Sequence, residues 1–177
     1  TDRIGLRGML SVGDWQYDGN VTASLLDDSQ NVIPNSEEVT LYLDEVKVGD
    51  AAQFTASLGL DVEIVKGLTI DANYRRADNL YAAIDATDFD SVDNDGSLKL
   101  PSFGLLDAGL GFTLPFLDNT MNFRFNMNNV LDETYISESD TNRFASADDE
   151  VYDGINTSNR VFFGLGRTWN VTVRFNF

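Results

Sequence analysis

The sequence contains neither cysteine nor histidine, and it is poor in basic residues. Without cysteine the chain can form no disulfide and no thiolate metal site. Without histidine it lacks a Ser–His–Asp or Cys–His nucleophile system and an imidazole-bound zinc. Paired carboxylates remain possible as acid–base groups, but acids are so abundant that any pair would be coincidental. We therefore expect no enzyme, no cofactor and no metal centre.

The charge balance excludes a further class of partner. Twelve Lys and Arg residues stand against 29 Asp and Glu, which gives a net charge of −17. Proteins that hold nucleic acid through its phosphates need the opposite sign. We expect no nucleic-acid partner.

Long apolar runs are also missing. No run approaches the roughly 18 residues of a transmembrane helix, and the mean hydropathy is −0.20. A strand crosses a membrane with only about 9–11 alternating residues, so these values leave a membrane β-protein open. Residues 1–3 lead directly into patterned sequence, without a signal peptide. We expect the chain to begin partway through a larger protein.

The dominant pattern is the alternation of apolar with polar or small residues. From Val161 to Phe177 the odd positions are mostly apolar and the even positions mostly polar or glycine. Similar alternation occupies about residues 4–17, 53–64, 68–75, 106–114 and 121–128. Successive side chains of a strand point to opposite faces, so each segment is predicted to be a strand with one apolar face. We predict six strands and no helix of useful length.

The connections between these segments alternate strictly between short and long. Residues 65–67 and 116–119 have the composition of hairpin turns, whereas residues 18–50, 78–99 and 132–160 form long connections. The long connections carry 8, 6 and 8 acidic residues, which is 22 of the 29 in the chain. Short periplasmic turns and long extracellular loops are typical of outer-membrane barrels. A soluble sandwich has no reason to place its short turns at one end.

Features of residues 161–177 indicate that their apolar face contacts lipid and not the interior of a soluble sandwich or barrel. Its apolar face is long, and aromatic residues gather at its ends. Arg167 lies ten residues before Phe177, and a strand tilted by about 40° climbs about 25 Å over that spacing, which is the height of the apolar band. Arg167, Trp169 and Phe177 are therefore candidates for the lipid interface, with Arg167 meeting lipid phosphate or standing as a plain exposed arginine. Six strands do not close a barrel, so further strands are expected on other residues or subunits.

Two segments resemble a known family. Residues 126–136 read NMNNVLDETYI, similar to the N-x-x-N-hydrophobic-x-D-x-x-Y signature at the end of the penultimate strand of TonB-dependent receptors. Residues 164–177 look like the final strand of that family, with its terminal aromatic residue. Residues 48–53 and 100–107 are similar to the segments that lead into earlier strands of these receptors. The sequence is similar to receptors of the Bacteroidetes type.

The resemblance implies that residues 1–177 are the last six strands of a 22-strand antiparallel transmembrane β-barrel. It implies a Gram-negative outer membrane, with lipid and lipopolysaccharide around the barrel, and uptake of a siderophore, vitamin, glycan or peptide energised by TonB. The plug domain and the TonB contact would lie outside this chain. The barrel-assembly machinery would read the C-terminal strand, and a surface lipoprotein is a further possible partner.

The polar faces of the predicted strands supply the candidate site residues. Asp71, Asp107 and Arg124 are favoured as lumen-facing contacts to a plug, with ordinary solvation as the alternative. The wider lumen-facing set comprises Asp61, Glu63, Asp71, Arg75, Asp107, Arg124 and Arg174.

Two features of the long connections bear on ligand binding. The acidic stretch at 88–96 lacks the spacing and distal Glu of an EF-hand, so a solvated loop is favoured over a calcium site. Tyr42, Phe89, Phe144 and Tyr152 would stack on a ligand or, more commonly, pin a loop to its neighbours.

Two other functions remain open at this level. A passive porin-type barrel would lack the plug, and a soluble or surface β-sandwich binding module would stay monomeric without detergent. The residues before Thr1 and the need for detergent separate these alternatives.

Overall fold

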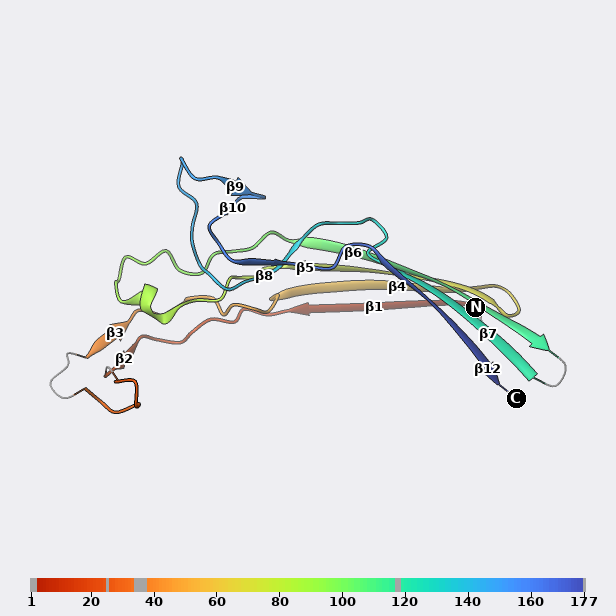
Figure 1. The fold of residues 1–177 in the computed structure, drawn as a ribbon, viewed down its shortest axis with the longest axis horizontal. Coiled ribbons are helices and arrows are strands. Elements are labelled where there is room, and N and C mark those ends of the chain that lie inside the picture. The colour runs from red at the N-terminus through yellow and green to blue at the C-terminus, as the bar shows by residue number, and fades with distance from the viewer. Residues whose placement is uncertain (1–2, 25, 34–37, 117–118, 177) are drawn as a thin grey trace.

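The computed structural model describes residues 3–24, 26–33, 38–116 and 119–176. These residues form an all-β structure, with one long antiparallel sheet, three two-stranded ribbons and a single-turn 3-10 segment (Figure 1). Within the described residues, no helix is both long and apolar enough to cross a membrane.

Six strands form the main sheet in the order β1-β4-β5-β6-β7-β12, and every pair is antiparallel. Their bounds are β1 Ile4–Val12, β4 Phe54–Val65, β5 Leu68–Asp78, β6 Phe103–Phe116, β7 Asn119–Asn128 and β12 Thr168–Asn176. The prediction of six antiparallel strands is confirmed. The first is shorter than expected, because it ends at Val12 and Gln16 forms only an isolated bridge to Lys47.

Short and long connections lie at opposite ends of the sheet (Figure 1). Lys66 and Gly67 turn β4 into β5, and Gly67 has a φ of 86°, which glycine adopts without strain. β6 ends at Phe116 and β7 begins at Asn119, so the second predicted turn lies largely outside the described residues. β1 begins and β12 ends at the short-turn end of the sheet. The predicted division of the connections is confirmed.

The last predicted strand is not continuous, and this part of the prediction is wrong. β11 (Val161–Phe163) pairs with β8 (Ile136–Ser139) in a separate ribbon, and β12 starts only at Thr168. Between them, the Leu165 carbonyl accepts from the Asn129 side chain and the Arg167 N–H donates to the Asp132 side chain, so these two groups do not bond to a neighbouring strand. The apolar series continues through the break, which is why alternation alone missed it.

The long connections contain short ribbons that the sequence pattern did not predict. β2 (Val21–Ala23) pairs with β3 (Val39–Leu41), and β9 (Val151–Tyr152) pairs with β10 (Ile155–Asn156). The 3-10 turn η1 spans Ala86–Phe89. Strands of two to four residues are too short to establish a period of two.

Buried apolar side chains lie almost entirely in the long connections. Apart from Leu105 on β6, the buried hydrophobic residues of the described chain belong to two loop clusters. One comprises Leu80, Ala82, Leu98, Leu100, Ile136 and Ile155, and the other Leu43, Val46 and Phe89. The loop end therefore holds the only described hydrophobic cores, and the sheet covers no core of its own.

Candidate functional site

One face of the sheet is apolar and the other is polar, and this difference extends across all six strands. The strand registers align Ile4, Val62, Ile70, Leu110, Phe125 and Val171 in one row across all six strands. The adjacent row on the opposite face is Gly5, Asp61, Asp71, Gly109, Asn126 and Asn170. Since facing partners share a side of the sheet, six short alternations combine into one apolar and one polar surface.

The apolar surface is not packed against anything in the described chain. Leu110 is 44% exposed and Val173 56% exposed, while Phe123 between them is partly exposed. Burial of these three residues in one compact interior would have excluded a lipid-facing sheet. The structure places them instead on an open surface.

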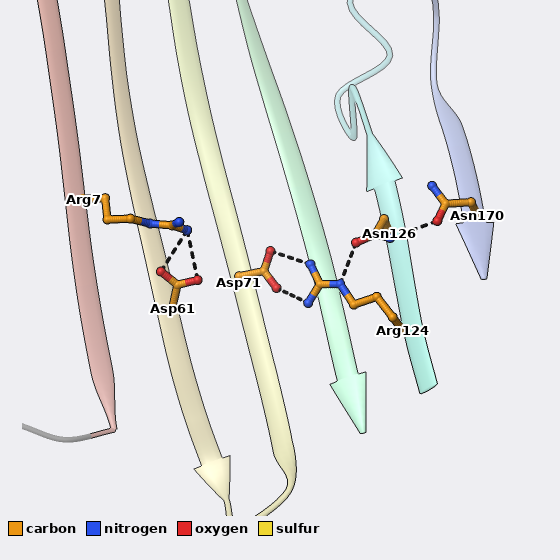
Figure 2. Close-up of polar contacts among 6 residues, drawn as sticks. All are labelled: Arg7, Asp61, Asp71, Arg124, Asn126 and Asn170. Carbon is orange, nitrogen blue, oxygen red and sulfur yellow. Dashed lines mark hydrogen bonds and ion pairs between the residues drawn. The ribbon is translucent and has the colours of Figure 1, made fainter. Parts of the chain in front are cut away.

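The polar surface is organised around an ion pair between Asp71 on β5 and Arg124 on β7 (Figure 2). Two parallel hydrogen bonds join them, at 2.5 Å from Nη1 to Oδ2 and at 2.9 Å from Nη2 to Oδ1. β6 lies between the two strands, and a Cβ built on its Gly109 would lie 2.1 Å from Arg124 Nη2. The ion pair therefore crosses β6 through space that only glycine leaves free.

Further polar contacts continue the line toward both edges of the sheet (Figure 2). Arg124 Nε donates to Asn126 Oδ1 at 2.7 Å, and Asn126 Nδ2 donates to Asn170 Oδ1 on β12 at 2.9 Å. On the other side, Arg7 on β1 pairs with Asp61 on β4 at 2.9 Å. Side chains from five of the six strands thus form a polar line across one face.

Asp107, the third lumen candidate, belongs to a separate group nearer the long connections. Its Oδ2 lies 3.4 Å from Arg75 Nη2, and its Oδ1 accepts from the backbone N–H of Asn129 at 2.9 Å. The structure therefore joins Asp71 to Arg124 but not to Asp107. No contact of these three to a plug is tested, and that role stays a prediction.

Asn129 is the centre of a clasp that sequence reasoning did not identify as structural. Its buried amide donates to the carbonyls of Glu133 at 2.8 Å and Leu165 at 3.3 Å, and its Oδ1 accepts from the Glu133 N–H at 2.9 Å. Its φ of 49° lies in the left-handed region, which Asn tolerates better than most residues. One side chain thus ties the end of β7 to the approach to β12.

The other residues of the same signature complete the clasp. Asp132 Oδ1 accepts from the backbone N–H of Arg167 at 2.9 Å. The Tyr135 ring lies against Gly164, where an added Cβ would be 1.9 Å from Tyr135 Cζ. We name Asn129, Asp132, Tyr135, Gly164 and the backbone of residues 165–167 the Asn129 clasp. It explains both the signature and the break before β12.

The lipid-interface candidates occupy different settings. Trp169, on the apolar face of β12, is 67% exposed. Arg167 precedes the strand, and its Nε donates to the Val130 carbonyl at 3.0 Å. Phe177 lies outside the described residues. Contact of these residues with lipid stays a prediction.

A cleft of about 530 Å³ lies between two of the long connections. It is lined by Asp85, Asp88, Phe89, Asn94, Asp95, Gly96, Asp140, Thr141, Asn142, Arg143, Phe144 and Arg160. Phe89 is 1% exposed and packs with Leu43 and Val46, so it pins its loop. Phe144 remains 38% exposed at the wall of the cleft. Among the described residues, no group of three or more acidic side chains is arranged to hold a metal ion.

Asp85 at this cleft caps η1. Its Oδ1 accepts from the backbone N–H of Thr87 at 3.0 Å and from the Thr87 hydroxyl at 2.7 Å. These bonds favour the charged form, so the pKa of Asp85 lies below its usual value, with the backbone N–H as the largest cause. The turn depends on a carboxylate that stays ionised at neutral pH.

No protein-family model matches the chain, and no curated protein matches it. Among solved structures, it is similar to the closed form of the ferric-catecholate import receptor Fiu from Escherichia coli K12, with a TM-score of 0.46 and 14% sequence identity. The alignment covers 97% of this chain and 25% of that receptor, so the chain spans about a quarter of its length. The functional case therefore rests on the two faces of the sheet and on its loops.

Proposed function

We propose that this chain is the C-terminal part of the β-barrel of a TonB-dependent receptor in a Gram-negative outer membrane, of a Bacteroidetes-like type. The receptor takes up a nutrient ligand with energy supplied through TonB. One observation carries the proposal: the sheet exposes a continuous apolar face, while the buried apolar residues are confined to its loop end.

Lipid is the solvent that suits such a face. Leu6, Leu60 and Trp169 belong to one register row and are all exposed. Each such side chain is about 1.5–3 kcal/mol less stable in water than when it is fully buried. Acyl chains restore that burial without a second sheet, and the polar face then borders a wet lumen.

The two open edges of the sheet support a larger barrel. In the described chain no strand pairs with the outer edge of β1 or of β12. Within a bilayer every unpaired backbone group costs several kcal/mol. We infer that strands outside this chain pair with both edges and complete a barrel of about 22 strands, which this family's plug would fill.

The lumen face is suited to binding a plug through exchangeable polar contacts. Asp71, Asp107 and Arg124 already have partners within the sheet. A plug would therefore contact a surface of ion pairs and hydrogen bonds and not isolated charges. Trp169 contacts the lipid and its lipopolysaccharide, and the barrel-assembly machinery reads the terminal strand. A surface lipoprotein would cover the acidic loops.

Cysteine labelling in cells tests location and orientation. In a cysteine-free version of the full native gene product, cysteines replace Val171 on the apolar face, Thr172 on the polar face and Asp153 in a loop. An impermeant maleimide added to intact cells should label D153C. Only V171C should react with a probe dissolved in lipid. If V171C reacts with the aqueous maleimide as readily as D153C does, the proposal is contradicted. It is also contradicted if the native protein stays monomeric without detergent.

Energy coupling is tested separately. The full native protein in detergent should retain the purified periplasmic domain of TonB, as a plug-bearing receptor does and a passive porin does not. Absence of that binding, with membrane location intact, leaves the porin-type barrel as the function.

A further inference from the structure

The cleft between the long connections has walls that are already built. Asn142 accepts from the Leu98 N–H at 2.7 Å and donates to the Gly96 carbonyl at 2.7 Å, which joins the two loops that form the cleft. Asn159 accepts from the Arg143 N–H at 2.9 Å and donates to the Arg143 carbonyl at 2.7 Å. Side chains of Asn142 and Asn159 thus hold both walls before any ligand arrives.

Several polar groups of the lining are satisfied within the protein. Arg160 Nε pairs with Asp140 Oδ2 at 2.9 Å, and Asp85 accepts from Thr87. Asn94 donates to the Tyr42 and Ser91 carbonyls. These groups shape the cleft, and they need no ligand to complete their hydrogen bonds.

Charges of both signs remain at the same cleft. The guanidinium of Arg143 and the carboxylates of Asp88 and Asp95 make no hydrogen bond or ion pair with other described residues. The exposed ring of Phe144 follows Arg143 in sequence and lines the same wall. The cleft therefore offers one cationic group, two anionic groups and an aromatic surface.

We propose that this cleft binds a zwitterionic ligand, namely a short peptide with free termini. The peptide carboxylate pairs with Arg143, because guanidinium binds carboxylate with two parallel hydrogen bonds. The peptide ammonium pairs with Asp88 or Asp95, and an apolar side chain packs on Phe144. A volume of about 530 Å³ is within the usual range for small-ligand sites.

The charge around the cleft argues against an anionic ligand. The three long connections carry 22 acidic residues and only four basic ones, namely Lys47, Lys99, Arg143 and Arg160. Such a field repels polyanions and concentrates cations, whereas a zwitterion of no net charge is not repelled. Ligand binding here rests on the proposed receptor function, and it narrows the nutrient to peptides.

The test uses the full native protein in detergent and titration calorimetry with tripeptides Gly-X-Gly, where X is Gly, Lys or Phe. Saturable binding is expected, with the Phe peptide tightest. Amidation of the C-terminus and acetylation of the N-terminus should each weaken binding at least tenfold. The D88N/D95N double variant and the R143Q variant should each do the same.

A matched control separates the cleft from the general loop charge. Asp153 lies in the β9–β10 turn, outside the cleft, with a φ of 48° that Asn also tolerates. D153N should bind peptide like the wild type. Failure of all three peptides to bind, or equal binding by the capped peptides, overturns the inference. Membrane labelling and TonB binding report on the receptor function independently, so failure of one proposal is distinguishable from failure of the other.

Discussion

Arg124 forms an ion pair with Asp71 across the intervening strand β6, and its guanidinium lies against Gly109. The pair links β5 to β7, which are not hydrogen-bonded neighbours, and so braces the polar face across three strands. Both side chains are partly exposed, Asp71 at 25% and Arg124 at 39%, which limits the pair to about 1 kcal/mol or less. The arrangement gives a direct test of the polar face.

Replacing Gly109 by alanine should displace the ion pair. The new Cβ would meet Arg124 Nη2 and Asp71 Oδ2, so the guanidinium must swing away. We expect a loss of about 1 kcal/mol in the free energy of unfolding, measured by urea titration of the full protein in detergent. In an R124A background the same substitution should cost almost nothing. Gly5→Ala is the control, because its Cβ meets Asp61 at an ordinary 3.6 Å.

A charge on the apolar face should be costly only if that face meets lipid. Val171→Arg, near the middle of β12, is expected to lower the stability of the barrel in a bilayer by about 2–4 kcal/mol. Thr172→Arg, one residue on and facing the other way, should change it little. The measurement is reversible unfolding from lipid vesicles. If the two variants are equally stable, the apolar face does not lie in a membrane.

The Asn129 clasp should be sensitive to a single atom. Asn129→Asp keeps the tolerance of positive φ but removes the amide that donates to Glu133 and Leu165. One carboxylate oxygen still accepts from the Glu133 N–H, but the other faces two carbonyls in a buried site, which should cost about 2–3 kcal/mol. Hydrogen exchange at residues 165–167 should rise with it. Asn122→Asp, which keeps its role as acceptor for Thr113, should leave both measurements unchanged.

The 3-10 turn at the cleft should loosen in acid. The pKa of Asp85 is lower in the folded chain than in the unfolded one, so its contribution is fully present above the unfolded pKa. It is lost as the pH falls through the folded pKa. Hydrogen exchange of residues 85–89, corrected for intrinsic rates, should therefore accelerate on acidification. In D85N the same segment should exchange faster already at neutral pH and show little further change.

Alternation predicted the main sheet because, along each strand, one row of side chains is mostly apolar and the opposite row is mostly polar or small. Residues 121–128 and 168–176 kept strict alternation and became paired strands with their polar residues facing each other. The same reasoning placed Asp71 and Arg124 on one face. It did not predict their pairing, which depends on the register of three strands and on the missing side chain at Gly109.

The break before β12 and the cleft were beyond the reach of sequence pattern. Leu165 keeps the odd–even series, yet its carbonyl is taken by Asn129 and not by a neighbouring strand. Likewise, Asn142 and Asn159 look like ordinary loop residues until the folded connections bring Gly96 and Arg143 to them. Periodicity reports the environment of a side chain, whereas these contacts depend on tertiary hydrogen bonds to the backbone.

The Asn129 clasp closes both ends of the third long connection at the same point of the sheet. Asn129, Asp132 and Tyr135 hold its start, and the backbone of residues 164–167 holds its return. The segment between them is thereby insulated from the strands that carry it. A change in the length or sequence of that segment should therefore leave the pairing of β7 with β12 unchanged.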